Sequence, residues 1–300
     1  MTEAQTRAGF VAIVGAPNVG KSTLLNRLVG AKVSIVSPKV QTTRSRVLGI
    51  CIEGSSQVVF IDTPGIFTPK RRLDRAMVAA AWGGAGDADD VLLLVDAKRG
   101  LDADTQGIVK RLKQSERTVI LALNKVDLVK KPSLLALATE LNETGIFSET
   151  FMISAEKGEG CDELMEHLAG RMAAGPWLFP EDQISDMPGR LLAAEITREK
   201  LYLQLHQELP YATSVDTEGW QEKKDGSVKI DQVIYVERAT QKAIVLGNKG
   251  KRIKAIGEAS RKELEVLLER RVHLFLFVKV REKWGDDPDR YRDLGLDFDA

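Results

Sequence analysis

Eight consecutive residues near the N-terminus constrain the fold of this chain more than any other stretch: Gly15-Ala16-Pro17-Asn18-Val19-Gly20-Lys21-Ser22. They fit the phosphate-loop pattern G-x-x-x-x-G-K-[ST]. An apolar run at residues 10–14 precedes them and a helical pattern at 23–28 follows, which predicts a strand, a loop and a helix in that order. Such a loop turns backbone N–H groups inward, and the helix N-terminus behind it adds positive potential. The stretch therefore predicts a site for an anion.

Two side chains of this loop carry chemistry that a nucleotide needs. Lys21 is expected to reach the β- and γ-phosphates, and Ser22 is expected to hold Mg²⁺. The other predicted nucleotide contacts in this stretch are Gly15, Asn18, Val19, Gly20 and Thr23. A glycine-rich turn that merely caps a helix is the alternative, and the complete pattern with its correct flanks argues against it.

The first half of the chain alternates short apolar runs with helical patterns, which is typical of a doubly wound α/β fold. Strands are predicted at 10–14, 47–53, 57–62, 91–96, 118–123 and 149–153, which gives a mixed, mostly parallel six-stranded sheet. Only Gly54-Ser55-Ser56 joins the second strand to the third. Because so short a link cannot hold a crossover helix, one strand is expected to run antiparallel.

The composition changes after a predicted helix at 161–172. Prolines and glycines between 174 and 189 cannot continue a helix, and Trp177 and Phe179 are expected to pin this link to a neighbouring surface. At 300 residues the chain exceeds the usual size of one domain. We therefore predict a first domain at 1–173, a linker at 174–189 and a smaller α+β domain at 190–300.

Asp62-Thr63-Pro64-Gly65 ends a predicted strand and is typical of a segment that senses a γ-phosphate. The Asp62 carboxylate is expected to face Mg²⁺ through a water, and the Gly65 N–H is expected to reach the γ-phosphate. Upstream, Gln41-Thr42-Thr43-Arg44 offers threonine hydroxyls to the same ion. Thr43 is chosen over Thr42 by analogy alone. Alone, D-T-P-G is a common turn, but its place after a phosphate loop favours the nucleotide role.

Asn124-Lys125-Val126-Asp127 follows another predicted strand and indicates which base is bound. A carboxylate at Asp127 can accept both the N1–H and the exocyclic amine of guanine, and adenine lacks that pair of donors. Asn124 is expected to brace the loop, and the Lys125 stem is expected to lie over the base. Ser154-Ala155 is predicted to offer a backbone N–H to the guanine oxygen, although this signal has weight only in this order.

The sequences GAPNVGKS, QTTR, DTPG, NKVD and ISA, in this order, resemble those of translation-factor-class GTPases. The resemblance implies that Lys21, Thr43 and Gly65 take part in hydrolysis, and that Asn18 helps to hold a K⁺ ion. Ras-like enzymes carry a glutamine after the D-x-x-G segment to orient the attacking water, whereas this chain has Ile66. An isoleucine can neither donate nor accept a side-chain hydrogen bond, so slow intrinsic hydrolysis is expected.

The second half predicts a helix at 190–207, strands at 212–222 and 228–237, helices at 240–246 and 251–270, and a strand at 272–280. Gly247-Asn248-Lys249-Gly250 lies between the last two helices. Two glycines with no side chain in the way let a nucleic-acid backbone approach, although a lone G-x-x-G is often only a corner between helices.

The surroundings of this corner favour RNA. The predicted RNA-binding residues are Gly247, Asn248, Lys249, Gly250, Lys251, Arg252, Ile253 and Lys254, and an apolar floor for splayed bases is expected from Ile244, Val245, Leu246, Ile253 and Ile256. The loop and the element order resemble a type II KH domain, a module that binds single-stranded RNA. An acidic C-terminal tail with Asp286, Asp287, Asp289, Asp293, Asp297 and Asp299 confines RNA to one face.

A GTPase domain followed by a type II KH domain resembles the bacterial GTPases of ribosome assembly over nearly the whole chain. The resemblance implies binding near the 3′ end of 16S ribosomal RNA in a maturing small ribosomal subunit, release coupled to the nucleotide state, and loose association with the inner membrane. Mg²⁺ is the expected cofactor and K⁺ a second ion, and a monomer is expected.

Composition places few further limits. Lys plus Arg equal Asp plus Glu at 43 each, and two isolated cysteines suit a reducing cytosol. Residues 1–9 lack the layout of a signal peptide, and no apolar run is long enough to cross a bilayer, so a cytoplasmic location is expected. Two alternatives stay open: an RNA-binding module with a passive nucleotide domain, and a small-molecule kinase, which the guanine-reading segment disfavours.

Overall fold

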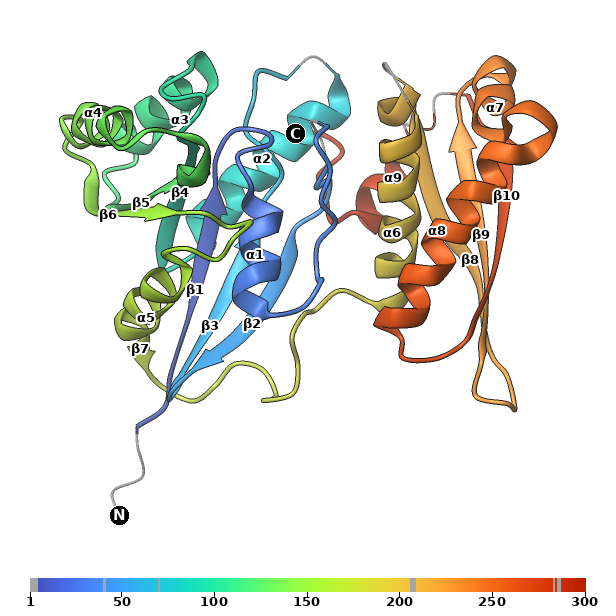
Figure 1. The fold of residues 1–300 in the computed structure, drawn as a ribbon, viewed down its shortest axis with the longest axis horizontal. Helices are drawn as coiled ribbons and strands as arrows, with labels where there is room; N and C mark the ends of the chain where they lie inside the picture. The colour runs from blue at the N-terminus through green and yellow to red at the C-terminus, as the bar shows by residue number, and fades with distance from the viewer. Residues whose placement is uncertain (1–4, 40–41, 70, 206–208, 283, 285–286) are drawn as a thin grey trace. The chain divides into compact units, whose positions relative to one another are not determined.

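The computed structural model describes residues 5–39, 42–69, 71–205, 209–282, 284 and 287–300. Contacts between Cα atoms divide the chain into two compact units (Figure 1). Unit 1 comprises Met1–Ser34, Thr43–Asp186 and Leu294–Ala300, and unit 2 comprises Ile35–Thr42 and Met187–Asp293. The predicted domain limits stay predictions. By their contacts, Ile35–Thr42 from the predicted first domain groups with unit 2, and Leu294–Ala300 from the predicted second domain groups with unit 1.

Unit 1 alternates strands and helices as the apolar pattern predicts. Its strands are β1 (Arg7–Val14), β2 (Val47–Glu53), β3 (Ser56–Asp62), β4 (Asp90–Asp96), β5 (Val119–Asn124), β6 (Phe147–Ile153) and β7 (Ala173–Ala174). Its helices are α1 (Lys21–Val29), α2 (Arg72–Asp87), α3 (Ala103–Gln114), α4 (Lys131–Asn142) and α5 (Cys161–Arg171), with a 3-10 turn, η1, at Val126–Leu128. The α/β fold class predicted for this half is confirmed.

The sheet of unit 1 runs in the order β2-β3-β1-β4-β5-β6. β2 pairs antiparallel with β3, as the short link between them predicted, and the other neighbours along this path are parallel. The predicted count of six strands is wrong by one, because Ala173 and Ala174 pair antiparallel with β1 as β7. Two residues are too short for an apolar alternation to reveal them.

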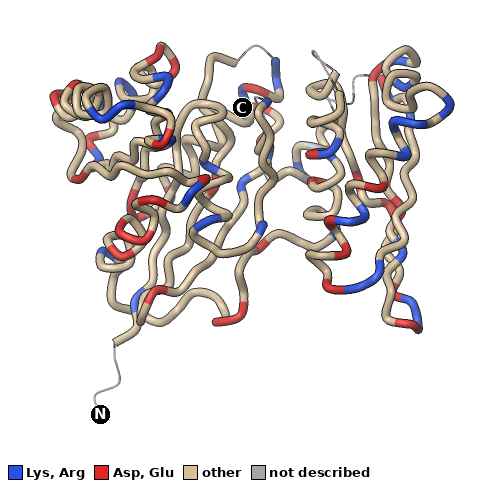
Figure 2. Tube along the Cα trace, viewed as in Figure 1, with Lys and Arg blue, Asp and Glu red and all other residues tan. Residues whose placement is uncertain are grey.

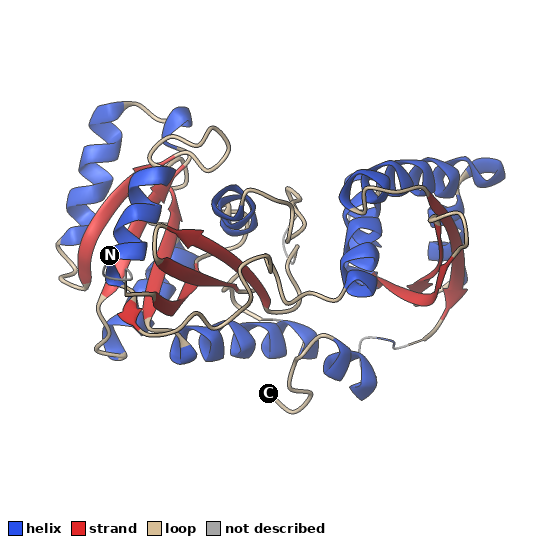
Figure 3. Cartoon of the chain, turned by 90° about the horizontal axis from the view of Figure 1, so that it is seen from below, coloured by secondary structure: helices blue, strands red, loops and turns tan. Residues whose placement is uncertain are grey.

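The helices of unit 1 cover both faces of its sheet. Helices α1 and α5 pack together on one face, and α2 lies on the other (Figures 1 and 3). Strands β3, β4 and β5 are buried from end to end, whereas most of the edge strand β6 is not. Parallel strands with both faces covered read as continuous apolar runs, which is why they were visible in the sequence.

The predicted link at 174–189 lies partly along the sheet edge. Trp177 donates its indole N–H to the carbonyl of Ser55 at 3.1 Å, and Gln57 accepts the N–H of Phe179 at 3.0 Å. Further on, Ile50 donates its N–H to the carbonyl of Ile184 at 2.9 Å. The expectation that this link is pinned to a neighbouring surface is confirmed.

Unit 2 follows the predicted order of helix, two strands, two helices and a strand. Its elements are α6 (Gly189–Gln204), η2 (Leu209–Ala212), β8 (Thr213–Glu222), β9 (Val228–Val236), α7 (Ala239–Leu246), η3 (Asn248–Gly250), α8 (Lys251–Leu267), β10 (Val272–Val280) and α9 (Pro288–Asp293). The predicted helix end at Gln207 lies outside the described residues, as do Gln41 and Asp286 of the predicted segments. Helix α9 was not predicted in the acidic tail.

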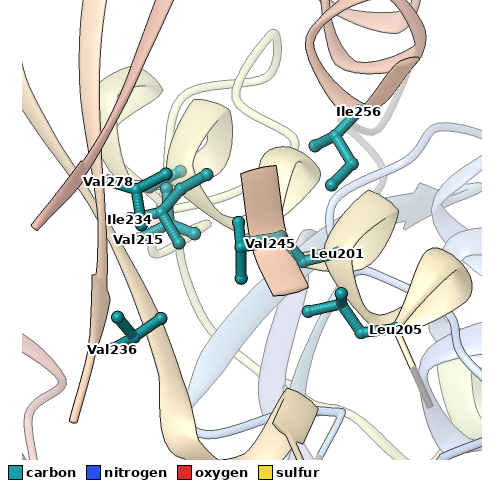
Figure 4. Packing of buried hydrophobic residues seen from close by; sticks show 9 residues of the cluster. Leu201, Leu205, Val215, Ile234, Val236, Val245, Ile256 and Val278 are labelled. Atoms are coloured by element: carbon teal, nitrogen blue, oxygen red, sulfur yellow. The ribbon is translucent and has the colours of Figure 1, made fainter. Parts of the chain in front are cut away.

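The three strands of unit 2 pair in the order β10-β9-β8, with β9 parallel to β10 and antiparallel to β8. Their inner side chains meet the helices in two apolar clusters, one of which is shown in Figure 4. The members of the cluster in Figure 4 are Ala194, Leu201, Leu205, Val215, Ile234, Val236, Val245, Ile256 and Val278. This cluster draws on every helix and strand from α6 to β10, so it holds the corner between α7 and α8 on a packed base.

Candidate nucleotide site and RNA loop

Lys21 is buried at the start of α1, where the phosphate loop ends. Its ammonium group donates to the carbonyls of Gly15 at 3.1 Å and Ala16 at 3.0 Å. Burial lowers the pKa of Lys21 to about 8, and the nearby Asp62 carboxylate acts in the opposite direction. A lysine held this way points a localised positive charge into the loop that precedes it.

The conformation of the loop depends on Gly20, which caps α1 with a φ of 104°. A Cβ at this position would lie 2.3 Å from the side-chain nitrogen of Asn124. Only glycine combines this backbone angle with so close an approach. The phosphate loop and the predicted base-reading segment are therefore packed against each other.

Three hydroxyl groups converge on one oxygen of Asp62. Ser22 donates to Oδ2 at 2.8 Å, Ser34 at 2.9 Å and Thr43 at 3.4 Å, and the hydroxyls of Ser22 and Thr43 are 2.9 Å apart. The carboxylate is fully buried, and burial raises its pKa, whereas Lys21 and the three hydroxyls lower it. The predicted Mg²⁺ residues thus lie together, and Ser34 joins them without having been predicted.

The structure separates the two threonines between which the sequence could not decide. The Thr43 hydroxyl faces Ser22 and Asp62, whereas the Thr42 hydroxyl donates to the carbonyls of Lys39 at 2.7 Å and Ser37 at 3.3 Å. Thr43 therefore has the geometry of the predicted role. The role itself stays a prediction.

The oxygen cluster suits a hard cation. Asp62 Oδ1 is buried and has no hydrogen-bond partner among the residues that the structure describes. Within the same residues, no group of three or more His, Cys, Asp or Glu side chains could hold a metal by itself. Mg²⁺ prefers oxygen ligands and usually combines one or two carboxylates with substrate phosphates and waters. The residues present fit that ion.

The segment after Asp62 is fastened to neighbouring backbone. The Thr63 hydroxyl donates to the carbonyl of Ile13 at 2.8 Å, and the Ile66 N–H donates to the carbonyl of Gly15 at 3.1 Å. Ile66 is buried, so no polar side chain stands after Gly65 at this position. A Cβ on Gly65 would lie 3.0 Å from Pro17, so this segment packs closely against the phosphate loop.

Asn124 braces the predicted base-reading loop, as expected. Its amide donates to the carbonyl of Val19 at 2.7 Å, and its oxygen accepts the N–H groups of Lys125 at 2.8 Å and Ala155 at 2.9 Å. This one side chain ties three loops together. Because the Ala155 N–H donates to Asn124 here, its predicted contact with guanine stays a prediction.

Asp127 has the electrostatics that a guanine reader needs. A hydrogen bond from Ser154 lowers the pKa of the Asp127 carboxyl, with a smaller contribution from Lys157. Lys157 Nζ lies 3.7 Å from Asp127 Oδ2. The group is therefore an ionised acceptor at neutral pH. The Ser154 side chain thus stabilises the ionised carboxylate of Asp127, a role that the sequence did not predict for it.

Two side chains that sequence reasoning missed, Asp96 and Arg27, help to hold these loops in place. Lys125 Nζ lies 2.6 Å from Asp96 Oδ2 and donates to the carbonyl of Asn18 at 2.7 Å. Arg27 donates to the carbonyl of Glu156 at 2.6 Å. These partners lie far apart in the sequence, and charged residues at strand ends and helix faces carry no local signal of such pairing.

The predicted RNA loop is a corner of unusual backbone geometry. Gly247 has a φ of 70°, Lys249 of 49° and Gly250 of 75°, and Gly250 caps α8. A Cβ on Gly247 would lie 2.7 Å from Cβ of Arg252, whereas one on Gly250 would meet only Ile253 at 4.0 Å. Gly247 thus permits tight packing inside the corner, and Gly250 presents open backbone to the outside.

Basic residues cluster along the chain at this corner (Figure 2). Lys249, Lys251 and Lys254 are exposed, so they can meet phosphates. Arg252 instead donates to the carbonyl of Ile244 at 2.6 Å and closes the corner. The guanidinium of Arg252, one of the eight predicted RNA residues, is therefore already engaged by the protein backbone.

A groove of about 480 Å³ runs beside α8 and is lined by Ile253, Lys254, Gly257, Glu258, Arg261, Leu274, Phe275 and Leu276. The predicted apolar floor is partly wrong. Val245 and Ile256 are fully buried in the core of unit 2, where no base can reach them. Their helical spacing marked them as apolar, but spacing alone does not tell the core face of a helix from a groove. Ile253 alone of the five lines the groove.

No helix in the part of the chain that the structure describes is both long and apolar enough to cross a membrane.

Two family models match the chain: "50S ribosome-binding GTPase" over residues 10–125 and "KH domain" over residues 208–285. The chain is 64% identical over 293 residues to GTPase Era of Mesorhizobium japonicum, which covers 98% of this chain and 94% of that protein. It is 63% identical over 298 residues to GTPase Era of Brucella suis, with coverages of 99% and 96%.

Solved structures give the same result. An Aquifex aeolicus Era variant bound to GDP and AlF₄⁻ superposes with a TM-score of 0.92 at 41% identity, covering 97% of this chain and 99% of that chain. A structure of Era in complex with MgGDPNP and nucleotides 1506–1542 of 16S ribosomal RNA has the same TM-score of 0.92, identity of 41% and coverages of 97% and 99%. The predicted order of a GTPase domain and a KH domain is confirmed, and the chain belongs to the Era family of GTPases.

Proposed function

We propose that this chain is a GTP-binding and GTP-hydrolysing switch that binds the 3′ region of 16S ribosomal RNA during assembly of the small ribosomal subunit. The observation that carries the proposal is the joint geometry of Lys21, Asp62 and Asp127 within one unit. These residues supply a phosphate cation, a metal-facing carboxylate and a guanine acceptor. The RNA part is supported by the Era relative whose structure contains nucleotides 1506–1542 of 16S ribosomal RNA.

Each residue of the nucleotide site has a distinct role in this proposal. Lys21 neutralises the β- and γ-phosphates, and the inward-facing N–H groups of the phosphate loop orient them. Ser22, Thr43 and, through a water, Asp62 would hold Mg²⁺, which supplies charge neutralisation between the phosphates. Asp127 selects guanine. The Era relative with bound MgGDPNP supports the choice of this metal.

Hydrolysis by the isolated chain is proposed to be slow. The position after Gly65 carries Ile66, which is buried and engaged through its backbone only. We propose that a K⁺ ion near Asn18 assists turnover, because Asn18 is held in the left-handed region at a φ of 64° within the phosphate loop. Turnover at equal rates in KCl and NaCl would remove K⁺ from this account.

The nucleotide state is proposed to control RNA binding. A γ-phosphate orders the segments around Thr43 and Gly65, and hydrolysis releases them. By reciprocity, RNA that favours the GTP form tightens GTP by the same factor. The rival function, an RNA module with a passive nucleotide domain, leaves unexplained why Asn124 fastens the phosphate loop, the base-reading loop and Ala155 together.

Three properties rest on the resemblance to ribosome-assembly GTPases alone. We propose a cytoplasmic location, a peripheral fraction at the inner membrane and a monomeric state. Sedimentation of the purified chain with and without vesicles of bacterial inner-membrane lipid tests the last two together.

The RNA loop is tested by Gly250→Asp. The change adds a carboxylate to the open side of the corner, so binding of a 16S 3′-end oligonucleotide is expected to weaken about 10- to 100-fold through phosphate repulsion. Fluorescence anisotropy at constant salt and nucleotide measures it.

Gly226→Asp is the matched control for this test. Gly226 lies in the turn between β8 and β9 and has a φ of 79°, close to the 75° of Gly250. The same substitution therefore meets a similar backbone conformation there, outside the RNA loop. Equal losses in both variants would mean that charge or stability, and not the Gly247–Gly250 corner, governs RNA binding.

A further inference from the structure

The segment Ile35–Thr42 lies between α1 and β2, yet by its contacts it belongs to unit 2. The chain returns to unit 1 at Thr43, whose hydroxyl faces the Mg²⁺-type oxygen cluster. Within unit 2 the segment is attached to α6. One attachment is the ammonium group of Lys39, which donates to the carbonyl of Leu205 at the end of that helix.

Two charged side chains of α6 hold the ends of this segment. Glu199 Oε1 accepts the N–H of Val36 at 2.8 Å, and the Arg198 guanidinium donates to the carbonyl of Thr42. Thr42 directly precedes Thr43. Both bonds use backbone groups of the segment, so they constrain its path rather than the nature of its side chains.

These charges are buried, and burying a charge costs free energy unless the charge is paired and hydrogen-bonded. Arg198 is 2% exposed and Glu199 is 3% exposed. Arg198 pairs with Glu195, its neighbour one turn earlier, with Nε 2.7 Å from Oε1. Burial by itself lowers the pKa of Arg198, but Glu195 and Tyr202 together raise it above its ordinary value, so the guanidinium stays charged. A helix that only packed on a sheet would carry apolar residues here, because a buried pair seldom adds stability over them.

A further contact connects this pair of charges to the helix of the RNA loop. Lys200 Nζ lies 2.6 Å from Glu199 Oε2 and also contacts Glu263 on α8. Helix α8 begins directly after Gly250 and runs unbroken past Glu263. A continuous series of contacts therefore leads from helix α8, which follows the RNA loop, through Glu263, Lys200 and Glu199 to Val36 in the segment that precedes Thr43.

We propose that Glu199 and Arg198 are positioning residues that hold the backbone of Val36 and Thr42 and thereby set the entry of Thr43 into the nucleotide site, and that Lys200 links them to RNA bound at α8. The inference rests on the proposed function and names the contacts through which its two sites are coupled. A contiguous network with a backbone bond at one end provides a physical basis for such coupling, and energetic measurements must test it.

Two quantities separate positioning from mere structural support. The first is the ratio of affinities for a GTP analogue and GDP, because only the triphosphate form is expected to need Thr43. The second is the ratio of RNA affinities in those two nucleotide states. Both are measured on the full chain by titration with a fluorescent nucleotide and with a labelled 16S 3′-end oligonucleotide.

Glu199→Ala removes both the acceptor for Val36 and the charge facing Lys200. It is expected to weaken GTP-analogue binding about 5- to 50-fold and to leave GDP binding within about 2-fold. Glu199→Gln keeps an acceptor for the Val36 N–H but loses the charge. It is expected to retain the nucleotide ratio and to lower the RNA ratio towards one, as Lys200→Met should also do.

Lys262→Met is the matched control, because Lys262 is an exposed cation of α8 that pairs with Glu258 on the same helix. Unchanged GDP affinity and unchanged RNA affinity with GDP confirm that both units are folded in each variant. An unaltered nucleotide ratio in Glu199→Ala overturns the positioning role, whatever the RNA result. If RNA affinity in the wild type does not depend on nucleotide, the proposed switch fails, and the nucleotide ratio still decides the role of Glu199.

Discussion

Replacing Asp127 with Asn is expected to weaken GTP binding about 10²- to 10⁴-fold and to create affinity for xanthosine triphosphate. A site built to hydrogen-bond its ligand rejects a mismatched donor pattern strongly. The carboxylate accepts two N–H groups of guanine, whereas an asparagine accepts only the N1–H and donates to the oxygen that xanthine carries in place of the amine. Competition of both triphosphates against a fluorescent guanine nucleotide measures the exchange of specificity.

Glu156→Gln is the control for this exchange. It removes one negative charge from an exposed residue of the neighbouring loop, whose backbone carbonyl and not its side chain holds Arg27. A loss of GTP binding in Asp127→Asn with no gain for the xanthine nucleotide would contradict the base-reading role and indicate a damaged loop.

Replacing Lys21 with Met is expected to remove most nucleotide affinity. Truncating one member of a buried, hydrogen-bonded charge pair costs about 2–5 kcal/mol, which corresponds to roughly 30- to 5,000-fold in affinity. Lys110→Met on α3 is an exposed lysine change that should have no effect. Nearly unchanged affinity in Lys21→Met would mean that the phosphate loop binds without its cation.

The buried position of Lys21 also predicts a pH dependence. Its pKa of about 8 is lower than that of an ordinary lysine, and phosphates restore the charged form, so GTP binding takes up a proton where the free group is partly neutral. About half a proton per GTP is expected at pH 8 and almost none at pH 6.5. Calorimetry in buffers of different ionisation enthalpy measures this uptake, which Lys21→Met should abolish.

The helices and strands could largely be predicted from the sequence because short apolar runs and turn residues mark them locally. Buried strands such as β3 and β4 read as apolar runs, and the Lys224-Asp225-Gly226 turn marks the hairpin of β8 and β9. The two-residue β7 and the short α9 have too few residues for any periodicity. The predicted nucleotide residues lie in the loops of unit 1 and at or near the ends of its strands and helices.

Long-range contacts explain what the sequence could not predict. Ser34 joins Asp62 across the chain, and Glu199 bonds a backbone N–H far away in the sequence. Val245 and Ile256 carried the right polarity for a groove and proved to be core. In each case the deciding fact was which face of an element meets a partner, and no local pattern states that.

The most direct test of the switch is the affinity of the wild-type chain for a single-stranded oligonucleotide of the 16S 3′ end, with either a GTP analogue or GDP bound. The account predicts binding that is tighter by about 5- to 150-fold in one nucleotide state, together with an equal change in nucleotide affinity when RNA is present. Equal RNA affinity in both nucleotide states would contradict this account. The chain would then hold a GTPase unit and an RNA-binding unit with no thermodynamic coupling between them.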